Sequence, residues 1–116
     1  MILNLTANNV NIHLTSGQVH TIEPQPTPAR AQMNRMSTEA VPLSLSSQHI
    51  PVTQVELGKV EYLPPEEPGI TLIVSRLILE HPDTASRKDL VCVDRAIRDQ
   101  EGRVIGCKGF SRRNKA

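Results

Sequence analysis

Hydrophobic and polar residues alternate over short stretches in the first half of the chain, and this pattern predicts β-strands. The strands expected here lie at residues 3–5, 10–14, 18–22 and 50–57. Ser16-Gly17 is a turn signal between the second and third of them. Three prolines between residues 23 and 28 fix φ and remove backbone donors. That segment is therefore expected to be an extended crossing into a strand at Ala29-Arg30-Ala31.

The densest hydrophobic pattern lies between residues 64 and 109. The run Ile70-Thr71-Leu72-Ile73-Val74 is short, continuous and rich in β-branched residues, which predicts a buried strand. Ser75 is the expected N-cap of a short helix through Glu80, and Pro82 ends that helix because the residue before a proline avoids the helical region. A second buried strand is expected at 90–93, followed by a hairpin over 97–107 with its turn at 100–102.

These elements predict an α+β fold, with an antiparallel β-core and one or two short helices in the C-terminal half. The length of 116 residues favours a single domain over residues 1–116. Within it, residues 1–63 are expected to form mainly strands, 64–110 a strand, a helix, a strand and a hairpin, and 111–116 a basic tail. Residues 32–47 are weakly patterned and predict strand pieces with a mobile or inserted loop.

Composition narrows the classes of function. The chain has no Trp, one Tyr (Tyr62) and one Phe (Phe110), so its core must be aliphatic. Thirteen basic residues against 12 acidic ones give a net charge of +1. Neither a basic stripe nor enough stacking faces is present, which argues against binding to a nucleic-acid polymer. A secretory leader and a membrane-length apolar run are also missing, so we expect a soluble, cytoplasmic protein without membrane contact.

The cysteines and histidines suggest little chemistry. Cys92 and Cys107 are expected roughly opposite each other across the C-terminal hairpin, as two buried reduced thiols. With Ser16-Gly17 as a two-residue turn, His13 and His20 would face each other across the first hairpin. They would be either half of a metal site or a surface pair. The second interpretation is favoured because zinc needs at least three protein ligands, so we expect no metal.

Arginines beside apolar strands are the remaining candidates for function. They are Arg30, Arg76, Arg87, Arg95, Arg98 and Arg103. A guanidinium matches phosphate oxygens bidentately, and two or three of them with Phe110 or Tyr62 against a base would hold a nucleotide. The alternative is ordinary surface ion pairs, which composition alone favours. Phosphate-binding glycine loops and nucleophile elbows are absent from the sequence, so we expect neither an enzyme nor a cofactor.

The order of several short motifs resembles a known family. They are Asn4-Leu5-Thr6, Ala29-Arg30, Gly58-Lys59-Val60-Glu61-Tyr62-Leu63-Pro64, Ile73-Val74-Ser75-Arg76-Leu77, Arg87-Lys88-Asp89-Leu90 and Arg98-Asp99-Gln100-Glu101-Gly102. Together they resemble the first-described Thoeris anti-defence proteins of phages, over most of the chain. Each motif is short, and their order carries the resemblance. Ala7-Asn8 replaces the usual Pro-His, Lys88 replaces a small polar residue, and residues 32–47 match poorly.

The resemblance implies a phage protein that binds and sequesters a cyclic nucleotide immune signal without cleaving it. The signal is of the cyclic ADP-ribose type made by a TIR enzyme, and some relatives also hold cyclic oligonucleotides. The resemblance further implies a homo-oligomer with ligand pockets between subunits. Carried over by position, Arg30 and Arg98 are expected to contact phosphate, with Arg76 and Asp89 as weaker candidates. Arg103 and Phe110 complete the expected ligand-binding set.

Two other functions compete with this hypothesis. One is a small β-rich protein-interaction module without a nucleotide ligand, which binds a host protein through an edge strand or through Arg112-Arg113. The other is a small hydrolase of nucleotide signals whose Asp or His groups assemble only in the fold. Recovery of an intact small molecule from the protein would support sequestration and argue against both the interaction module and the hydrolase.

Overall fold

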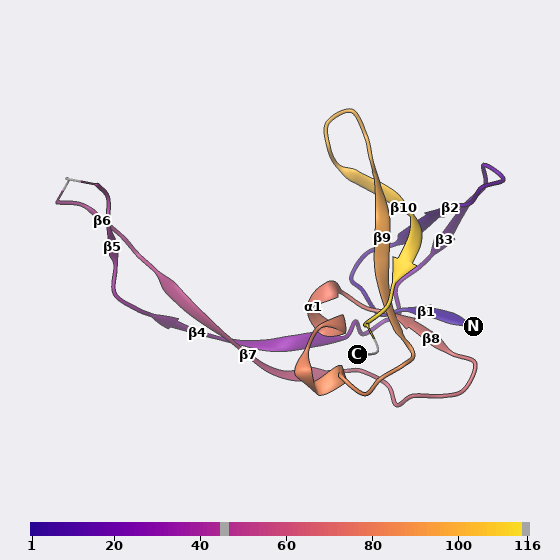
Figure 1. Cartoon of the computed structure of the whole chain (residues 1–116), viewed down its shortest axis with the longest axis horizontal. Coiled ribbons are helices and arrows are strands. Elements are labelled where there is room, and N and C mark those ends of the chain that lie inside the picture. Colours follow the sequence, from indigo (N-terminus) through magenta and orange to yellow (C-terminus); the bar gives the residue numbers. More distant parts are fainter. Residues whose placement is uncertain (45–46, 115–116) are drawn as a thin grey trace.

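The structure, a computed structural model, describes residues 1–44 and 47–114 (Figure 1). Its strands are β1 (Ile2–Asn4), β2 (Val10–His13), β3 (Val19–Ile22), β4 (Arg30–Ser37), β5 (Val41–Pro42), β6 (His49–Ile50), β7 (Thr53–Glu61), β8 (Thr71–Ile73), β9 (Leu90–Arg98) and β10 (Val104–Ser111). Its helical segments are α1 (Arg76–Leu79) and the 3₁₀ turn η1 (Pro82–Thr84).

The predicted α+β class is wrong. The fold is β-rich, with 47% of residues in strands and 6% in helices. The helix begins where expected, because the Ser75 side chain accepts the backbone N–H of Ile78 as an N-cap. It ends after Leu79, shortly before Pro82, and one turn is too short to form a helical layer. None of the helices in residues 1–44 and 47–114 is long and apolar enough to cross a membrane.

The main sheet is mixed rather than antiparallel. Its order is β1-β8-β9-β10-β2-β3, with parallel pairing of β1 with β8, β8 with β9 and β10 with β2. The sheet curls so that its ends meet, because Pro24, just after β3, bridges to Asn4 at the end of β1. The fully buried Asn4 side chain closes this seam by donating to the carbonyls of Asn8 and Ile22.

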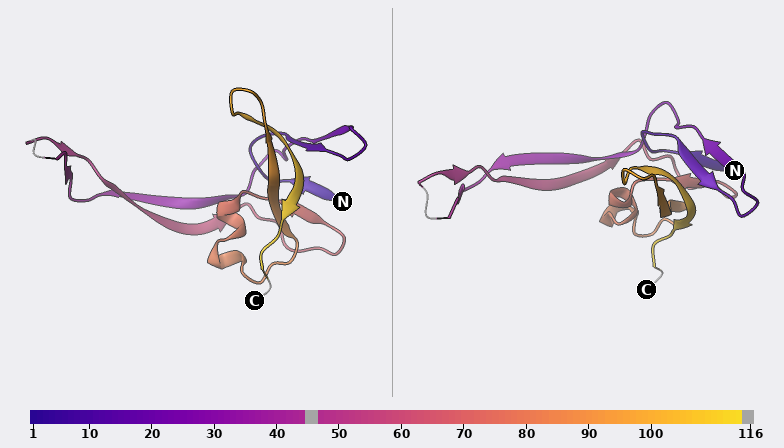
Figure 2. Two further views of the ribbon diagram at one scale, coloured as in Figure 1. Left: turned by 45° about the horizontal axis from the view of Figure 1, so that its top comes forward. Right: turned by 90° about the horizontal axis from the view of Figure 1, so that it is seen from above.

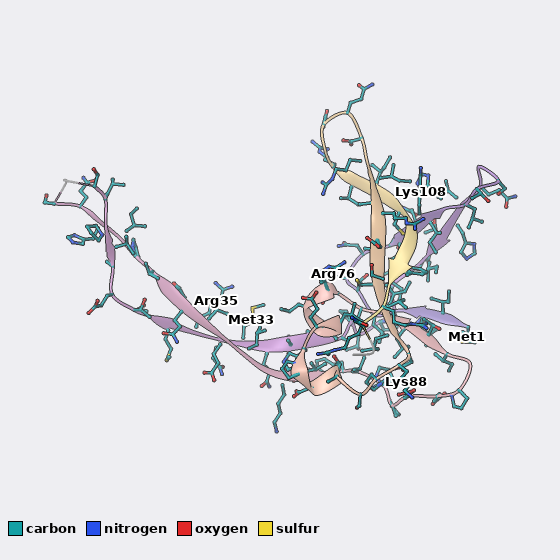
Figure 3. All side chains as sticks on the ribbon, in the orientation of Figure 1. Met1, Met33, Arg35, Arg76, Lys88 and Lys108 are labelled. Carbon is teal, nitrogen blue, oxygen red and sulfur yellow. The ribbon has the colours of Figure 1, made fainter. Side chains whose placement is uncertain are left out.

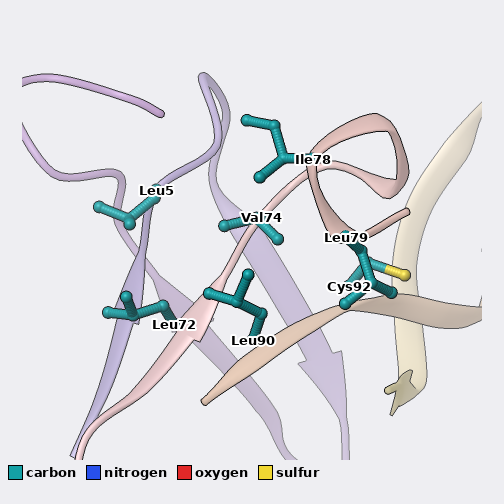
Figure 4. Close-up of a cluster of buried hydrophobic side chains, with 7 residues drawn as sticks. All are labelled: Leu5, Leu72, Val74, Ile78, Leu79, Leu90 and Cys92. Atoms are coloured by element: carbon teal, nitrogen blue, oxygen red, sulfur yellow. The ribbon is translucent and has the colours of Figure 1, made fainter. Parts of the chain in front are cut away.

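Hydrophobic residues cover both faces of this sheet in two clusters. The first cluster contains Leu5, Leu72, Val74, Ile78, Leu79, Leu90 and Cys92 (Figure 4). The second contains Val10, Ile73, Val91 and Cys107, with Phe110 packed against it. Consecutive residues of β8 and β9 alternate between the two, as the strand period requires. The core is therefore aliphatic, as the composition predicted.

A long two-stranded arm leaves this body. It pairs β4 with β7 and continues to the short β5–β6 pair (Figures 1 and 2). The molecule measures 58 × 38 × 32 Å and has a radius of gyration of 18.2 Å, whereas a compact chain of this length has about 13 Å. Much of the weakly patterned segment 32–47 thus forms regular strand in β4 and β5, and its residues 45–46 lie outside the described residues.

The base of the arm is fixed to the body by η1. The buried His81 side chain contacts the Gly58 carbonyl through Nε2 at 2.8 Å. It also accepts the Asp83 N–H at Nδ1, which caps η1. Arg113 donates to the carbonyls of Leu79 and His81 from the other side. The bonds from Arg113 occupy carbonyl groups at the end of α1, and the contact of His81 with Gly58 holds the base of the arm against this helical segment.

Candidate functional site

An open groove lies between the two proline-rich segments of the chain. Its volume is about 540 Å³, and its lining is mostly apolar. The lining residues are Leu3, Leu5, Gln25, Pro26, Thr27, Tyr62, Leu63 and Pro64. Gln25 and Thr27 supply its neutral polar groups. Pockets that bind small molecules have this volume and this kind of wall.

Backbone bonds hold one wall of the groove, the crossing at residues 23–28, against β1. The Gln25 N–H donates to the Asn4 carbonyl at 2.8 Å, and the Ala29 N–H donates to the Leu5 carbonyl at 3.0 Å. Prolines within the crossing limit its freedom further. This wall is therefore formed before any ligand arrives, which reduces the ordering cost of binding.

The opposite wall is held by an ion pair between the partly exposed Arg87 and the buried Asp89. Arg87 donates from Nε and Nη2 to the two carboxylate oxygens of Asp89, at 2.9 and 2.7 Å. Its Nη2 also donates to the Pro64 carbonyl at 2.8 Å, which fixes the loop after Tyr62. The hydrogen bond to Asp89 raises the pKa of the Arg87 guanidinium. Asp89, a predicted ligand residue, thus lies buried and supports the groove through Arg87.

Tyr62 presents its ring at the mouth of the groove and is 54% exposed. Its φ of 62° lies in the left-handed region, which costs a side-chain-bearing residue on the order of 1–3 kcal/mol. Strain of this kind is concentrated at functional sites. Sequence reasoning considered Tyr62 only as a possible stacking residue, because nothing in the sequence reveals this backbone conformation.

Arg30 stands beside this ring. Its Cζ lies 5.3 Å from the centroid of Tyr62, within the range of a cation–π contact. Its Nε is 3.5 Å from Oε1 of Glu61, and its side chain is 64% exposed. An exposed pair of this kind is worth about 0–1 kcal/mol, so the guanidinium can be redirected to an anion at little cost. Arg30 and Tyr62 together offer a positive fork and a flat aromatic face.

The other predicted ligand residues lie elsewhere in the chain. Arg98 and Arg103 flank the turn of the β9–β10 hairpin, which points away from the body (Figure 1). Arg98 donates to the Gly102 carbonyl at 2.8 Å, and Arg103 pairs with Glu101 at 3.0 Å. Asp99 caps that turn by accepting the N–H groups of Glu101 and Arg103.

Arg76 and Phe110 are also separate from the groove. Arg76 begins α1, makes an exposed contact of 3.5 Å with Glu80 and is labelled in Figure 3. Phe110 packs against the second hydrophobic cluster. Within one chain, therefore, the structure brings together Arg30 with Tyr62, and Asp89 with Arg87. It does not unite the predicted set.

Cys92 and Cys107 are both free and buried, as expected, but neither the two cysteines nor the two histidines lie opposite each other. In the β9–β10 pairing, Cys92 lies opposite Ser111. Cys107 lies opposite Ala96, which is four residues beyond Cys92 in β9. The thiols also lie on opposite faces of the sheet, and burial raises the pKa of both. His13 pairs with Val19 and His20 with Ile12, so these rings point to opposite faces. Across residues 1–44 and 47–114, no cluster of three or more metal-ligating side chains occurs.

Comparisons with known proteins add no relative. No family model, no curated protein and no solved structure matches this chain. The resemblance to Thoeris anti-defence proteins stays a hypothesis that depends on the order of short motifs.

Proposed function

We propose that this protein binds and sequesters a cyclic nucleotide immune signal of the cyclic ADP-ribose type without cleaving it. The observation that carries the proposal is the contact of Arg30 with Tyr62, whose side chain lines a groove of about 540 Å³. The ring supplies a stacking surface for a base, and the guanidinium supplies a fork for phosphate. The motif order described above supports the same ligand class.

The charge of the ligand requires more than one arginine. A pyrophosphate carries two negative phosphates, whereas the described lining residues of this groove include no arginine and Arg30 adjoins the groove through its contact with Tyr62. Arg98 and Arg103 are exposed on a hairpin that points away from their own groove. We therefore propose a homo-oligomer in which a second subunit supplies further arginines to each pocket. The setting would be the cytoplasm of a bacterial host infected by a phage, and cyclic oligonucleotides are a second possible ligand.

The groove also agrees with binding rather than chemistry. The groups in its lining are apolar side chains, the amide of Gln25 and the hydroxyls of Thr27 and Tyr62. Neutral amides and hydroxyls orient a ligand by hydrogen bonds, and none of them is a ready acid or base at neutral pH. Tight binding with slow release is the function that such a lining serves best.

Calorimetric titration with cyclic ADP-ribose tests the residue assignment. Arg30→Ala removes a charged hydrogen-bond donor, so we expect a loss of about 1.5–3 kcal/mol, or roughly tenfold to 150-fold weaker binding. Tyr62→Leu removes the stacking face and is expected to cost about 1–3 kcal/mol. Arg112→Ala is the matched control, because it removes an exposed arginine outside the groove. Equal loss in all three variants would exclude the groove as the site.

The arm favours a second candidate function, the protein-interaction module. Residues 33–37 of β4 and 53–57 of β7 are all exposed, and the outer edges of such a ribbon can accept a strand from another protein. In that case purified protein would contain no small molecule and would not bind one, while a host protein would remain attached through residues 33–57.

A further inference from the structure

Gln25 supplies the side-chain amide among the described residues that line the groove. The other lining side chains are apolar or carry a single hydroxyl, as Thr27 and Tyr62 do. A glutamine amide is planar and presents an oxygen that accepts hydrogen bonds beside an NH₂ group that donates them. Within residues 1–44 and 47–114, this amide makes no hydrogen bond to another part of the chain. Its donor and its acceptor are therefore both available to a ligand in the groove.

The backbone around Gln25 is held in place before a ligand arrives. Pro24 and Pro26 flank the residue, and each proline ring fixes its own φ. Pro24 bridges to Asn4, and the Gln25 N–H donates to the Asn4 carbonyl at 2.8 Å. The Asn4 side chain is itself fully buried and hydrogen-bonded. A side chain on so fixed a backbone meets a ligand at a reproducible position, which is the condition for selective hydrogen bonding.

We infer that Gln25 reads the base of the ligand and makes the groove selective for adenine. The inference rests on the proposed nucleotide ligand, whose base stacks on Tyr62 in the facing wall. Adenine carries a donor, the 6-amino group, beside an acceptor, N7, and a glutamine amide pairs with both. In cyclic ADP-ribose the N1 atom of adenine is bonded to ribose, so this edge stays free while the Watson–Crick edge is blocked. A base with oxygen at position 6 presents two acceptors there, of which the amide satisfies one.

Gln25 and Arg30 divide the recognition of the ligand according to charge. The described lining residues carry no charge, and the Arg30 guanidinium lies beside the Tyr62 ring, 5.3 Å from its centroid. A neutral base edge is matched by a neutral amide, whereas a guanidinium fork is matched by phosphate oxygens. An arginine in the place of Gln25 would select guanine instead, because N7 and O6 of guanine both accept. Gln25 therefore supplies selectivity for the base, and Arg30 supplies affinity for the phosphate.

Calorimetric titration with two matched ligands tests this inference. The ligands are cyclic ADP-ribose and its inosine analogue, cyclic IDP-ribose, which has oxygen in place of the 6-amino group. The wild-type protein is expected to bind the adenine ligand about five- to 150-fold more tightly. Gln25→Ala keeps the backbone bond to Asn4 and is expected to fold normally but to lose most of this preference. Gln18→Ala removes an exposed glutamine outside the groove and is expected to retain the preference in full.

The ratio of the two dissociation constants separates recognition of the base from a structural role. A structural role of Gln25 would weaken both ligands by the same factor in Gln25→Ala and would leave their ratio unchanged. An unchanged ratio, or a wild-type protein that binds both ligands equally, would overturn the inference and leave nucleotide binding established. If neither ligand binds to the wild-type protein, the inference and the proposed function both fail.

Discussion

Replacing Arg87 by alanine should destabilise the protein more than removal of any surface arginine. The Arg87 side chain is 17% exposed and that of Asp89 is 6% exposed, so the variant leaves a carboxylate buried without its partner. Breaking a buried pair in this way costs about 3–5 kcal/mol. The lost bond to the Pro64 carbonyl adds on the order of 1 kcal/mol. The total free energy of unfolding of a small domain is only about 5–15 kcal/mol.

Urea denaturation followed by circular dichroism measures this loss as a change in midpoint at constant slope. Arg76→Ala is the matched control, since its exposed contact with Glu80 is worth about 0.3–0.5 kcal/mol. The double variant Arg87→Met/Asp89→Leu removes both charges and should recover much of the stability lost by Arg87→Ala. A loss below about 1 kcal/mol for Arg87→Ala, or a loss equal to that of Arg76→Ala, would refute the buried-pair argument.

Three further predictions follow from the same structure. Gly106→Ala should lower the free energy of unfolding by about 1–3 kcal/mol, because its Cβ would lie 2.8 Å from the Asn11 carbonyl oxygen and 2.5 Å from His13 Nε2. Gly109→Ala, whose nearest neighbour lies at 3.7 Å, should be close to neutral in the same denaturation assay. The buried thiols of Cys92 and Cys107 should react with a thiol reagent slowly in the native protein and fast in urea. Equal reactivity of the thiols in the native protein and in urea would contradict this burial. Burial also raises the pKa of both thiols, so their contribution to the free energy of unfolding is fully present below the ordinary pKa of 9.0 and is lost as the pH rises through the pKa values of the folded protein. Arg98→Ala should abolish nucleotide binding by calorimetry and cost at most about 1 kcal/mol of stability through its bond to Gly102; wild-type affinity would remove Arg98 from the site.

Local signals predicted several elements correctly. Ser75 caps α1, Pro82 lies just beyond its end, Thr71–Ile73 forms a buried strand and the last turn falls at residues 100–102. Each of these depends on residues within a few positions of one another. The parallel pairings of the main sheet join segments that are far apart in the chain, as in Ile2 with Thr71 and Ile12 with Cys107, and no local pattern specifies them.

The residue pairing was predicted incorrectly in two hairpins, β2–β3 and β9–β10. The first hairpin closes with the Leu14 N–H bonded to the Gln18 carbonyl, so its loop is longer than Ser16-Gly17 and the pairing shifts by one residue. That shift turns His13 and His20 to opposite faces. The last hairpin turns at the predicted residues 100–102, and counting outward from that turn places Cys92 opposite Ser111, so the predicted pairing of Cys92 with Cys107 was wrong. The sequence predicted only strand pieces and a loop over residues 32–47, because strand β4 packs against no hydrophobic core along most of its length and so has no clear alternation of apolar residues.

The candidate site was only partly predictable. The sequence indicated Arg30 and a stacking role for Tyr62, and the structure places these two together. Arg87 was one arginine among several, and only the fold shows that it joins Asp89 to the Pro64 loop. The φ of Tyr62 and the groove between the proline-rich segments arise from long-range packing, which explains why sequence patterns did not reveal them.

Capture and release of the ligand tests the central claim most directly. The protein is incubated with the products of a TIR enzyme, washed free of unbound material and denatured by heat, and the released small molecules are identified by mass spectrometry. Sequestration predicts that intact cyclic ADP-ribose is released from the wild-type protein and from Arg112→Ala, and in a smaller amount from the more weakly binding Arg30→Ala. An altered product would show an enzyme instead, and a signal left entirely in the unbound fraction would contradict the account.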